Sequence, residues 1–108
     1  IILGVLTSRG RALAEEVYKD FDCPKIWTDP GTAEVTKHAA NAFLAMKVSF
    51  ANLLADVCEV TGADPESLLE GVGRDPRIGR KFMNPGVGYG GSCLPKDVSA
   101  FIHLAGEV

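Results

Sequence analysis

The run Thr32–Thr61 contains neither glycine nor proline, the two residues that most often interrupt a helix. Asp29-Pro30-Gly31 precedes it as a break in the chain, Thr32 is expected to cap it, and Gly62 follows where a glycine commonly ends a helix. The run predicts one helix of about 29 residues, roughly 43 Å long at 1.5 Å per residue. Because that length is far above the mean for globular proteins, we expect this helix to be the main element of the fold.

Apolar side chains fall on two opposite faces of this predicted helix when residues are placed at 100° intervals. One face carries Ala39, Met46, Phe50, Leu53 and Val57, and the other carries Leu44, Ala45, Val48 and Ala55. A helix that is apolar on two sides has to be covered on two sides, and 108 residues offer little material for the second cover. We therefore expect a partner, which is either a second copy of the chain or further domains.

The segment before the long run has the pattern of a piece of an α/β sheet. Ile1–Leu6 is a short apolar run rich in β-branched residues, which is typical of a strand buried on both faces. Thr7 or Ser8 can cap the helix expected over Arg9–Phe21, and Lys25–Thr28 resembles a second short strand. Such a unit cannot fold alone, so we expect its remaining strands upstream, in a longer protein from which this chain was taken.

The segment after the long run predicts two shorter helices joined by a loop. Asp64-Pro65 is typical of a helix start, and Gly73 closes the short helix that begins there. The stretch Arg74–Ser92 is rich in glycine and has the pattern of neither a helix nor a strand, and loops of this length are usually functional. Val98, Phe101, Ile102 and Ala105 form the apolar stripe of a last helix, which Ser92 or Leu94 is expected to cap.

The composition argues against several classes of function. The 11 Lys and Arg residues stand against 14 Asp and Glu residues, which gives a formal net charge of −3 and disfavours nucleic acid as a partner. No apolar run approaches the roughly 20 residues that a membrane-spanning helix needs. The three cysteines form no CxxC pair, and neither His38 nor His103 has a neighbour at metal-binding spacing. We expect reduced thiols, no metal and a cytoplasmic location.

Gly86–Gly91 satisfies GxGxxG, the dinucleotide fingerprint, but the match is weak. The fingerprint needs a strand directly before it, and Pro85 disfavours a central strand there. The better interpretation is a permissive loop that lies close to a ligand and offers backbone N–H groups to phosphate or sugar oxygens. A flexible linker is the alternative, which the direct continuation of the loop into Ser92-Cys93 disfavours.

Cys93 is the candidate nucleophile. We expect it at the start of the last helix, where unpaired N–H groups and the nearby Lys96 favour the thiolate. Asp97 follows one helical turn later on the same face, placed to act on whatever Cys93 binds, and the alternative for Asp97 is a solvated carboxylate. For Cys23 and Cys58 the pattern favours small buried apolar residues.

Lys37 and Asn41 lie one turn apart and form a polar island at the head of one apolar face of the long helix. A buried lysine needs a partner or a function, because removing an ammonium from water is costly. Alternatively, Lys37 reaches solvent or pairs with Glu34. Arg77 is a candidate anchor for a phosphate or a carboxylate, or it simply pairs with Asp75.

Three segments in order resemble the UDP-glucose/GDP-mannose dehydrogenase family: Ala33–Phe43, Asp75–Gly79 and Gly88–Asp97. The resemblance implies a mostly α fold, with a long-helix dimerisation domain like the C-terminal domain of 6-phosphogluconate dehydrogenase, preceded by a strand-helix-strand remnant of an α/β Rossmann domain. Residues 1–31 would be the end of the NAD-binding Rossmann domain. Residues 32–108 would be the central helical dimerisation domain that carries the catalytic cysteine.

The resemblance also implies a chemistry and a site. UDP-glucose would be oxidised to UDP-glucuronate with two NAD, through a thiohemiacetal and a thioester on Cys93. Lys37 would stabilise the oxyanion, Asn41 would hold the same oxygen or a water, and Asp97 would help to activate water. The substrate would be bound by Lys37, Asn41, Arg77, Phe82, Asn84, Gly86, Gly88, Tyr89 and Gly90, with Arg77 reaching across a homodimer formed through the helix 32–61. Cys93 and Lys96 would lie on the NAD side.

Two alternatives stay open beside UDP-glucose. GDP-mannose is the second candidate substrate, because Gly90–Asp97 fits both branches of the family whereas Asp75–Gly79 looks more like the UDP-glucose branch. The chain could also be an isolated oligomerisation module without activity of its own. Because the family's other catalytic residues and its fingerprint lie in the N-terminal domain, we expect the fragment alone to be inactive.

Overall fold

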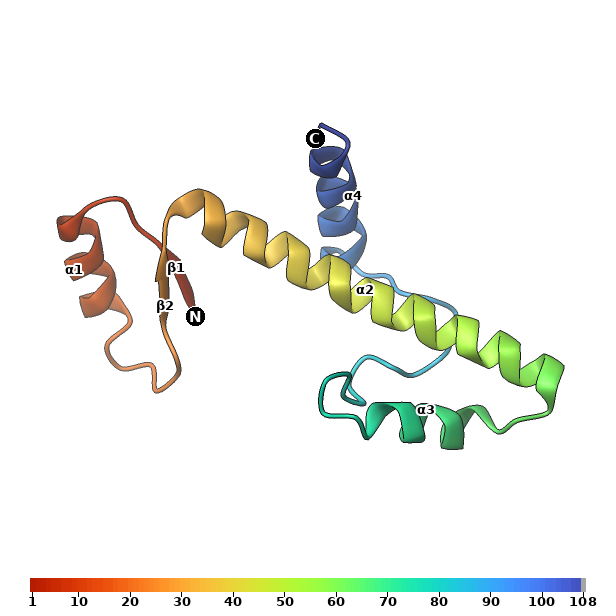
Figure 1. Cartoon of the computed structure of the whole chain (residues 1–108). Coiled ribbons are helices and arrows are strands. Elements are labelled where there is room, and N and C mark those ends of the chain that lie inside the picture. Colours follow the sequence, from red (N-terminus) through yellow and green to blue (C-terminus); the bar gives the residue numbers. More distant parts are fainter. Residues whose placement is uncertain (108) are drawn as a thin grey trace. The chain divides into compact units, whose positions relative to one another are not determined.

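The computed structural model describes residues 1–107 of the chain (Figure 1). Its elements are β1 (Ile2–Gly4), α1 (Ser8–Val17), β2 (Ile26–Thr28), α2 (Pro30–Thr61), α3 (Pro65–Gly73) and α4 (Cys93–Ala105). The predicted mostly α fold with a strand-helix-strand start is therefore confirmed. The chain forms two compact units, Ile1–Ala39 and Ala40–Val108, and the boundary between them falls inside α2.

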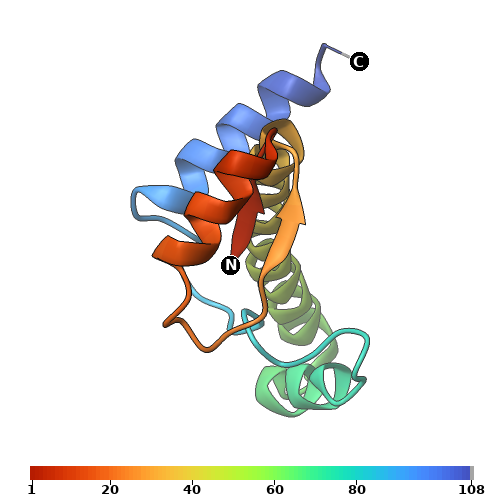
Figure 2. The ribbon, with the colours of Figure 1, turned by 90° about the vertical axis from the view of Figure 1, so that its left-hand side faces the viewer.

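The first unit is built on two parallel strands. Ile2 pairs with Ile26, Leu3 with Trp27 and Gly4 with Thr28, and Figure 2 shows the two strands side by side. The helix between them is shorter than predicted: α1 ends at Val17 rather than at Phe21. Tyr18 leaves the helical conformation with ψ 13°, and the chain turns there because the N–H of Phe21 bonds to the carbonyl of Tyr18 at 3.3 Å.

Side-chain caps define where the first two helices begin. Thr7 caps α1, as predicted, and its Oγ1 accepts a hydrogen bond from the N–H of Gly10 at 3.0 Å. The predicted cap of α2 is wrong: the helix begins at Pro30, and Asp29 caps it by accepting from the N–H of Thr32 at 2.9 Å. The hydroxyl of Thr32 also donates to the Oδ2 of Asp29 at 2.6 Å, and this bond and the one from the N–H of Thr32 lower the pKa of Asp29. Proline suits the first helical position, where no N–H is needed.

The second unit has its core between α2, α3 and the loop that follows α3. Ala51 of α2, Leu69 of α3 and Met83 of the loop are fully buried together. Leu54, Leu68 and Val72 pack against this cluster. Figures 1 and 2 both show α3 running beside the second half of α2. Gly62 takes φ 73° just after α2, which confirms the predicted glycine end of the helix.

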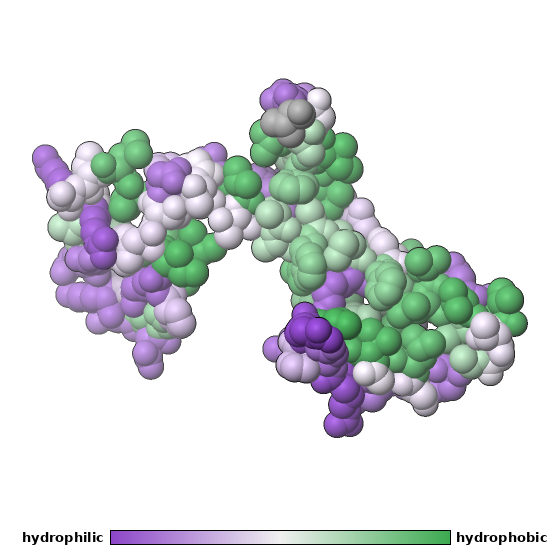
Figure 3. All heavy atoms as spheres, viewed as in Figure 1, coloured by the Kyte–Doolittle hydropathy of each residue, from purple (hydrophilic) through white to green (hydrophobic). Residues whose placement is uncertain are grey.

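The buried face of α2 differs from both predicted faces. Its buried residues are Ala45, Ala51 and Cys58, and only Ala45 belongs to a predicted face. The small side chain of Ala51 lets Leu69 of α3 and Met83 approach closely, a property that hydrophobic periodicity does not measure. One predicted apolar face is exposed: Met46, Phe50, Leu53 and Val57 are each 45–56% accessible. Figure 3 shows apolar residues gathered over the second half of α2 and over α3.

Replacing either of two glycines in α3 by alanine is expected to change the stability of the protein in opposite directions. At Gly73 a Cβ would lie 2.8 Å from the Cα of Arg80, whereas at Gly71 nothing lies within 4 Å of it. We expect Gly73→Ala to cost about 1–3 kcal/mol of stability by overpacking. Gly71→Ala should instead stabilise by up to about 1 kcal/mol through helix propensity. Thermal unfolding of the two variants tests this, and equal shifts in Tm would disprove the close approach of Arg80 to Gly73.

The predicted helix starts after α2 are partly right. Asp64 caps α3 by accepting from the N–H of Ser67 at 2.7 Å, and Pro65 is its first residue, as predicted. The helix α4 begins at Cys93, so Leu94 lies inside it, and Ser92 makes no capping hydrogen bond with its side chain. Among residues 1–107, none of the helices combines the length and apolar character needed to cross a membrane.

Candidate active site

A hydrogen bond between Asn41 and Asp97 connects α2 to the first turns of α4. The Nδ2 of Asn41 donates to the Oδ2 of Asp97 at 2.5 Å, although the two residues are 56 positions apart in sequence. Asp97 is fully buried, and its Oδ1 forms an ion pair with the ammonium of Lys96. The alternative interpretation of Asp97 as a solvated carboxylate is therefore wrong. A buried carboxylate needs such partners, because an isolated charge in the interior is costly.

Cys93 is the first residue of α4 and lies one helical turn before Asp97. Its side chain is exposed, and the Oγ of Ser92 lies 3.8 Å from its Sγ. Lys96 lies close enough to interact with both neighbours: its pKa is raised mainly by the hydrogen bond to Asp97, and further by the charges of Asp97 and Cys93. The exposed thiol thus lies at the positive end of a helix, beside an ammonium and a buried carboxylate.

The other two cysteines differ in their surroundings. Cys58 is 3% accessible inside α2, which confirms that it is a small buried residue. Cys23 lies before β2 and is exposed, so its predicted burial is wrong. Within residues 1–107, no group of three or more His, Cys, Asp or Glu side chains is placed to hold a metal ion.

Lys37 and Arg77 have exposed side chains, whereas Asn41 is half-buried. Lys37 lies in α2, one turn before Asn41, and its side chain is exposed, which agrees with the alternative interpretation that Lys37 reaches solvent. Arg77 pairs with Asp75, as the second interpretation of Arg77 proposed: its Nη2 lies 2.5 Å from the Oδ2 of Asp75. This pairing lowers the pKa of Asp75 and raises that of Arg77. The side chain of Arg77 is 87% accessible in this arrangement and so remains open to solvent.

Three side chains hold the loop between α3 and α4, and the sequence patterns identified none of them as functional. The Nζ of Lys47 donates to the carbonyls of Ile78 and Gly79 at 2.9 and 3.0 Å. The Oδ1 of Asn52 accepts from the N–H of Gly86 at 2.7 Å. Arg80, within the loop, donates to the carbonyl of Met83 at 2.7 Å. The sequence held only a weak indication of their role, which is that Lys47 and Asn52 are polar residues on a helix that is mostly apolar.

The loop itself has the permissive backbone that its glycines predict. Gly88 and Gly91 have φ values of 112° and 80°, which residues with a Cβ rarely adopt. Phe82 has φ 62° and is the one non-glycine residue with positive φ in residues 1–107, a conformation that commonly marks a functional site. Asn84, Gly86, Tyr89 and Gly90 are exposed along the same loop. No strand lies directly before Gly86 in the described structure, where the preceding element is α3, so the weak GxGxxG match is not a dinucleotide fingerprint.

Residues 31–108 match the family described as "UDP-glucose/GDP-mannose dehydrogenase family, central domain". The chain belongs to this family. It is 47% identical over 104 residues to UDP-glucose 6-dehydrogenase TuaD of Bacillus subtilis, covering 96% of the chain and 23% of that relative. It is 46% identical over 110 residues to the UDP-glucose 6-dehydrogenase of Rhizobium meliloti, covering 97% and 25%.

Solved structures of this family agree with the fold. A UDP-glucose dehydrogenase from the archaeon Pyrobaculum islandicum matches with a TM-score of 0.94 at 42% identity, covering 99% of this chain and 25% of that one. A GDP-mannose dehydrogenase from Pseudomonas aeruginosa matches with a TM-score of 0.66 at 34% identity, covering 98% and 25%. The chain thus spans about a quarter of the length of these family members.

Proposed function

We propose that this chain is the segment of a UDP-glucose 6-dehydrogenase that supplies the catalytic cysteine. The observation that carries the proposal is the start of α4, where the exposed Cys93 lies one turn before the buried Asp97 and Asn41 holds the Asp97 carboxylate at 2.5 Å. A nucleophile at a helix start beside an oriented carboxylate is suited to covalent catalysis on a carbonyl carbon. We further propose that the enzyme acts in the cytoplasm.

In the proposed reaction, C6 of the sugar is oxidised first to an aldehyde and then to an acid. The thiolate of Cys93 attacks the aldehyde carbon and forms a thiohemiacetal, whose oxidation gives a thioester that water hydrolyses. The buried Asp97 helps to activate that water, and Asn41 holds the oxygen or the water beside it. Lys37, one turn before Asn41 in α2, stabilises the oxyanion.

The proposed cofactor is NAD, which would accept a hydride in each oxidation step when bound. The exposed ammonium of Lys96 and the N-terminal end of α4 fit a dinucleotide, because both offer positive charge to phosphate oxygens. Lys96 and Cys93 are the residues of this chain proposed to lie beside it.

UDP-glucose is proposed over GDP-mannose as the substrate. The chain is more similar to the UDP-glucose dehydrogenase of Pyrobaculum islandicum than to the GDP-mannose dehydrogenase of Pseudomonas aeruginosa, with TM-scores of 0.94 and 0.66. The loop residues Phe82, Asn84, Gly86, Gly88, Tyr89 and Gly90 are proposed to bind the sugar nucleotide. Their exposure and the positive φ of Phe82 and Gly88 support a loop shaped for a ligand.

Rapid alkylation of Cys93 is the first experiment for this proposal. In the intact enzyme we expect iodoacetamide to modify Cys93 faster than exposed Cys23 and much faster than buried Cys58, because Cys93 is the proposed nucleophile and lies exposed at the start of α4. UDP-glucose should slow the modification of Cys93 alone. Peptide mapping by mass spectrometry measures the three rates. Equal rates at Cys23 and Cys93, unchanged by UDP-glucose, would contradict the proposed nucleophile.

We also propose that the enzyme is a homodimer through the long helix. The exposed stripe of Met46, Phe50, Leu53 and Val57 supports this, because contiguous apolar surface of this kind is typical of interfaces. An apolar cavity of about 290 Å³ adjoins the stripe, and Phe43, Met46, Phe50 and Arg77 are among the residues that line it. Arg77 is proposed to reach the substrate of the neighbouring subunit, and its position in the lining of this cavity supports that proposal.

Phe50→Glu is expected to weaken this dimer by at least tenfold in Kd, because it places a charge within an apolar interface. Sedimentation over a range of concentrations measures the change. Glu59→Lys is the matched control, since Glu59 is exposed and lies nine residues later, about 180° around the helix from Phe50. Dissociation by both variants, or by neither, would argue against the stripe as the interface.

A further inference from the structure

Arg80 connects the acidic side of α3 to the loop that carries the proposed substrate-binding residues. One nitrogen of its guanidinium, Nη1, donates to the carbonyl of Met83 at 2.7 Å and to the Oδ1 of Asn84 at 2.6 Å. Its other nitrogens face α3, with Nε 3.6 Å from the Oε2 of Glu70 and Nη2 3.9 Å from the Oε1 of Glu66. The guanidinium thus contacts the helix and the loop at the same time.

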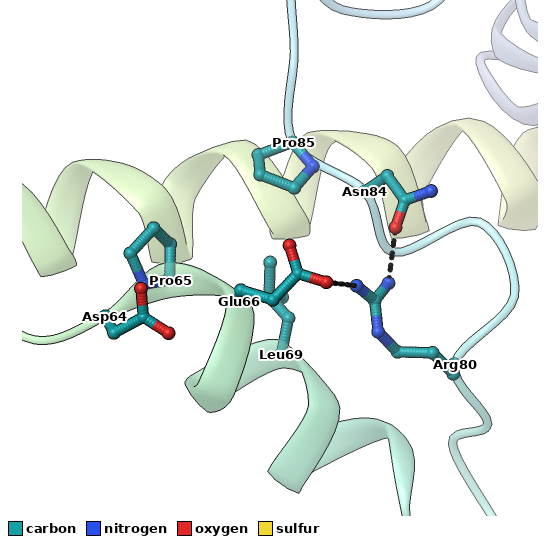
Figure 4. A pocket seen from close by; sticks show the side chains of 7 residues that line it. All are labelled: Asp64, Pro65, Glu66, Leu69, Arg80, Asn84 and Pro85. Atoms are coloured by element: carbon teal, nitrogen blue, oxygen red, sulfur yellow. Dashed lines mark hydrogen bonds and ion pairs between the residues drawn. The ribbon is translucent and has the colours of Figure 1, made fainter.

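The surroundings of Arg80 restrict its position. Gly73, at the end of α3, allows the close approach of Arg80, because a Cβ there would lie 2.9 Å from the Cδ of Arg80. The side chain of Arg80 is 29% accessible and forms one side of a pocket of about 480 Å³. Figure 4 shows Glu66 and Asn84 pointing toward the guanidinium from two sides, with dashed lines marking both contacts.

Contact with Arg80 fixes which end of the Asn84 amide is available to a ligand. Arginine carries only donors, so the amide oxygen of Asn84 faces Arg80 and its NH₂ group is directed elsewhere. The same guanidinium holds the carbonyl of Met83, the residue that directly follows Phe82 with its φ of 62°. Holding both residues after Phe82 stabilises a backbone conformation that a phenylalanine otherwise disfavours.

We propose that Arg80 is a positioning residue for substrate binding: it orders the segment Phe82–Gly86 and presents Asn84 to the sugar nucleotide as a hydrogen-bond donor. This inference rests on the proposed function for its ligand, but the ordering of the loop does not depend on it. Arg80 acts through Asn84 and the backbone, so its loss should weaken the binding of substrate and leave the chemistry at Cys93 unchanged.

The test compares Arg80→Met, Arg80→Lys and Arg74→Ala in the intact enzyme. Arg74 is the matched control, because its Nε also contacts Glu70, at 2.9 Å, and it has no contact with Met83 or Asn84 among its hydrogen bonds and ion pairs in the described residues. We expect Arg80→Met to raise KM for UDP-glucose about tenfold or more with kcat within about twofold, because charge-assisted hydrogen bonds are lost. Arg80→Lys should restore part of the affinity, and Arg74→Ala should change neither parameter.

Amide hydrogen exchange gives a second readout that does not depend on activity. In Arg80→Met, exchange over Phe82–Gly86 should become faster, while the Arg74→Ala variant should match the unmodified protein. Asn84→Asp completes the test: its carboxylate still accepts from Arg80 but offers no donor, so KM should rise while exchange stays slow.

The outcomes separate the inference from the proposed function. If the unmodified enzyme does not oxidise UDP-glucose, the proposed function fails and hydrogen exchange alone decides on the ordering role of Arg80. If exchange and KM are unchanged in Arg80→Met, or if Arg74→Ala has the same effects as Arg80→Met, the positioning role is overturned. If Arg80→Met does not fold, Arg80→Lys and Asn84→Asp still test the positioning role of Arg80. An unchanged KM for UDP-glucose in both variants would overturn that role.

Discussion

Replacing Cys93 by serine in the intact enzyme is expected to lower the formation of sugar acid on the order of 10³-fold or more. Serine keeps the size and the position of the side chain at the start of α4, but its hydroxyl is far less nucleophilic than a thiolate. Because Cys93 is proposed to capture the aldehyde, the variant should retain some capacity for the first oxidation. Chromatography of the products, with UDP-glucose as the substrate, measures acid and aldehyde separately.

Cys23→Ser is the control for this experiment, because Cys23 is also exposed but belongs to the first unit and is not proposed to take part in the reaction. It should leave the rate of acid formation unchanged. A normal yield of acid from Cys93→Ser would remove Cys93 from the mechanism, and with it the proposed covalent intermediate.

Replacing Asp97 by alanine is expected to destabilise the second unit by about 3 kcal/mol. The carboxylate is fully buried, and its removal leaves the amide of Asn41 without the acceptor that it contacts at 2.5 Å. Acid formation should also fall, because Asp97 is proposed to activate water. Urea denaturation followed by circular dichroism measures the loss of stability.

Asp97→Asn separates the structural role of Asp97 from its chemical role. The amide can still accept from Asn41 through its oxygen, so stability should fall less than in Asp97→Ala, by about 1 kcal/mol. Activity should fall in both variants, because neither retains the charge. A loss below about 0.5 kcal/mol in Asp97→Ala would be typical of a surface site and would contradict the role of this contact.

Local features of the structure were predictable from the sequence because local hydrogen bonds set them. Thr7, Asp64 and Gly62 mark helix ends through contacts within four residues, and the structure has each of them in that role. The start of α2 was missed because Asp29-Pro30 was interpreted as a break. The same two residues form a cap and a first helical position, which is the arrangement correctly predicted at Asp64-Pro65.

Packing was less predictable, because it depends on which side chains leave room for a neighbour. Periodicity identified the exposed stripe of α2 as apolar, yet it did not identify Ala51, which the core contains. Alanine contributes little to a hydrophobic pattern, but here its small size lets Leu69 and Met83 pack against the helix.

In the candidate site, too, local features were predictable from the sequence and contacts between distant residues were not. The position of Cys93 at a helix start follows from local sequence, whereas the contact of Asn41 with Asp97 joins residues 56 positions apart. The pairing of Lys47 with the loop spans 31 and 32 positions, and that of Asn52 spans 34. Only the fold brings such residues together. The family resemblance implied roles for Asn41 and Asp97, whereas the structure was needed to identify Lys47, Asn52 and Arg80 as residues that hold the loop.

The most direct measurement is the amount of NADH formed per UDP-glucose consumed by the intact enzyme, with GDP-mannose offered separately. Two NADH per UDP-glucose, with UDP-glucuronate as the product and little turnover of GDP-mannose, is the expected result, because an alcohol becomes an acid by losing four electrons. One NADH per sugar with the aldehyde as the final product, or no NADH from UDP-glucose, would contradict the proposed role of Cys93 and its surroundings.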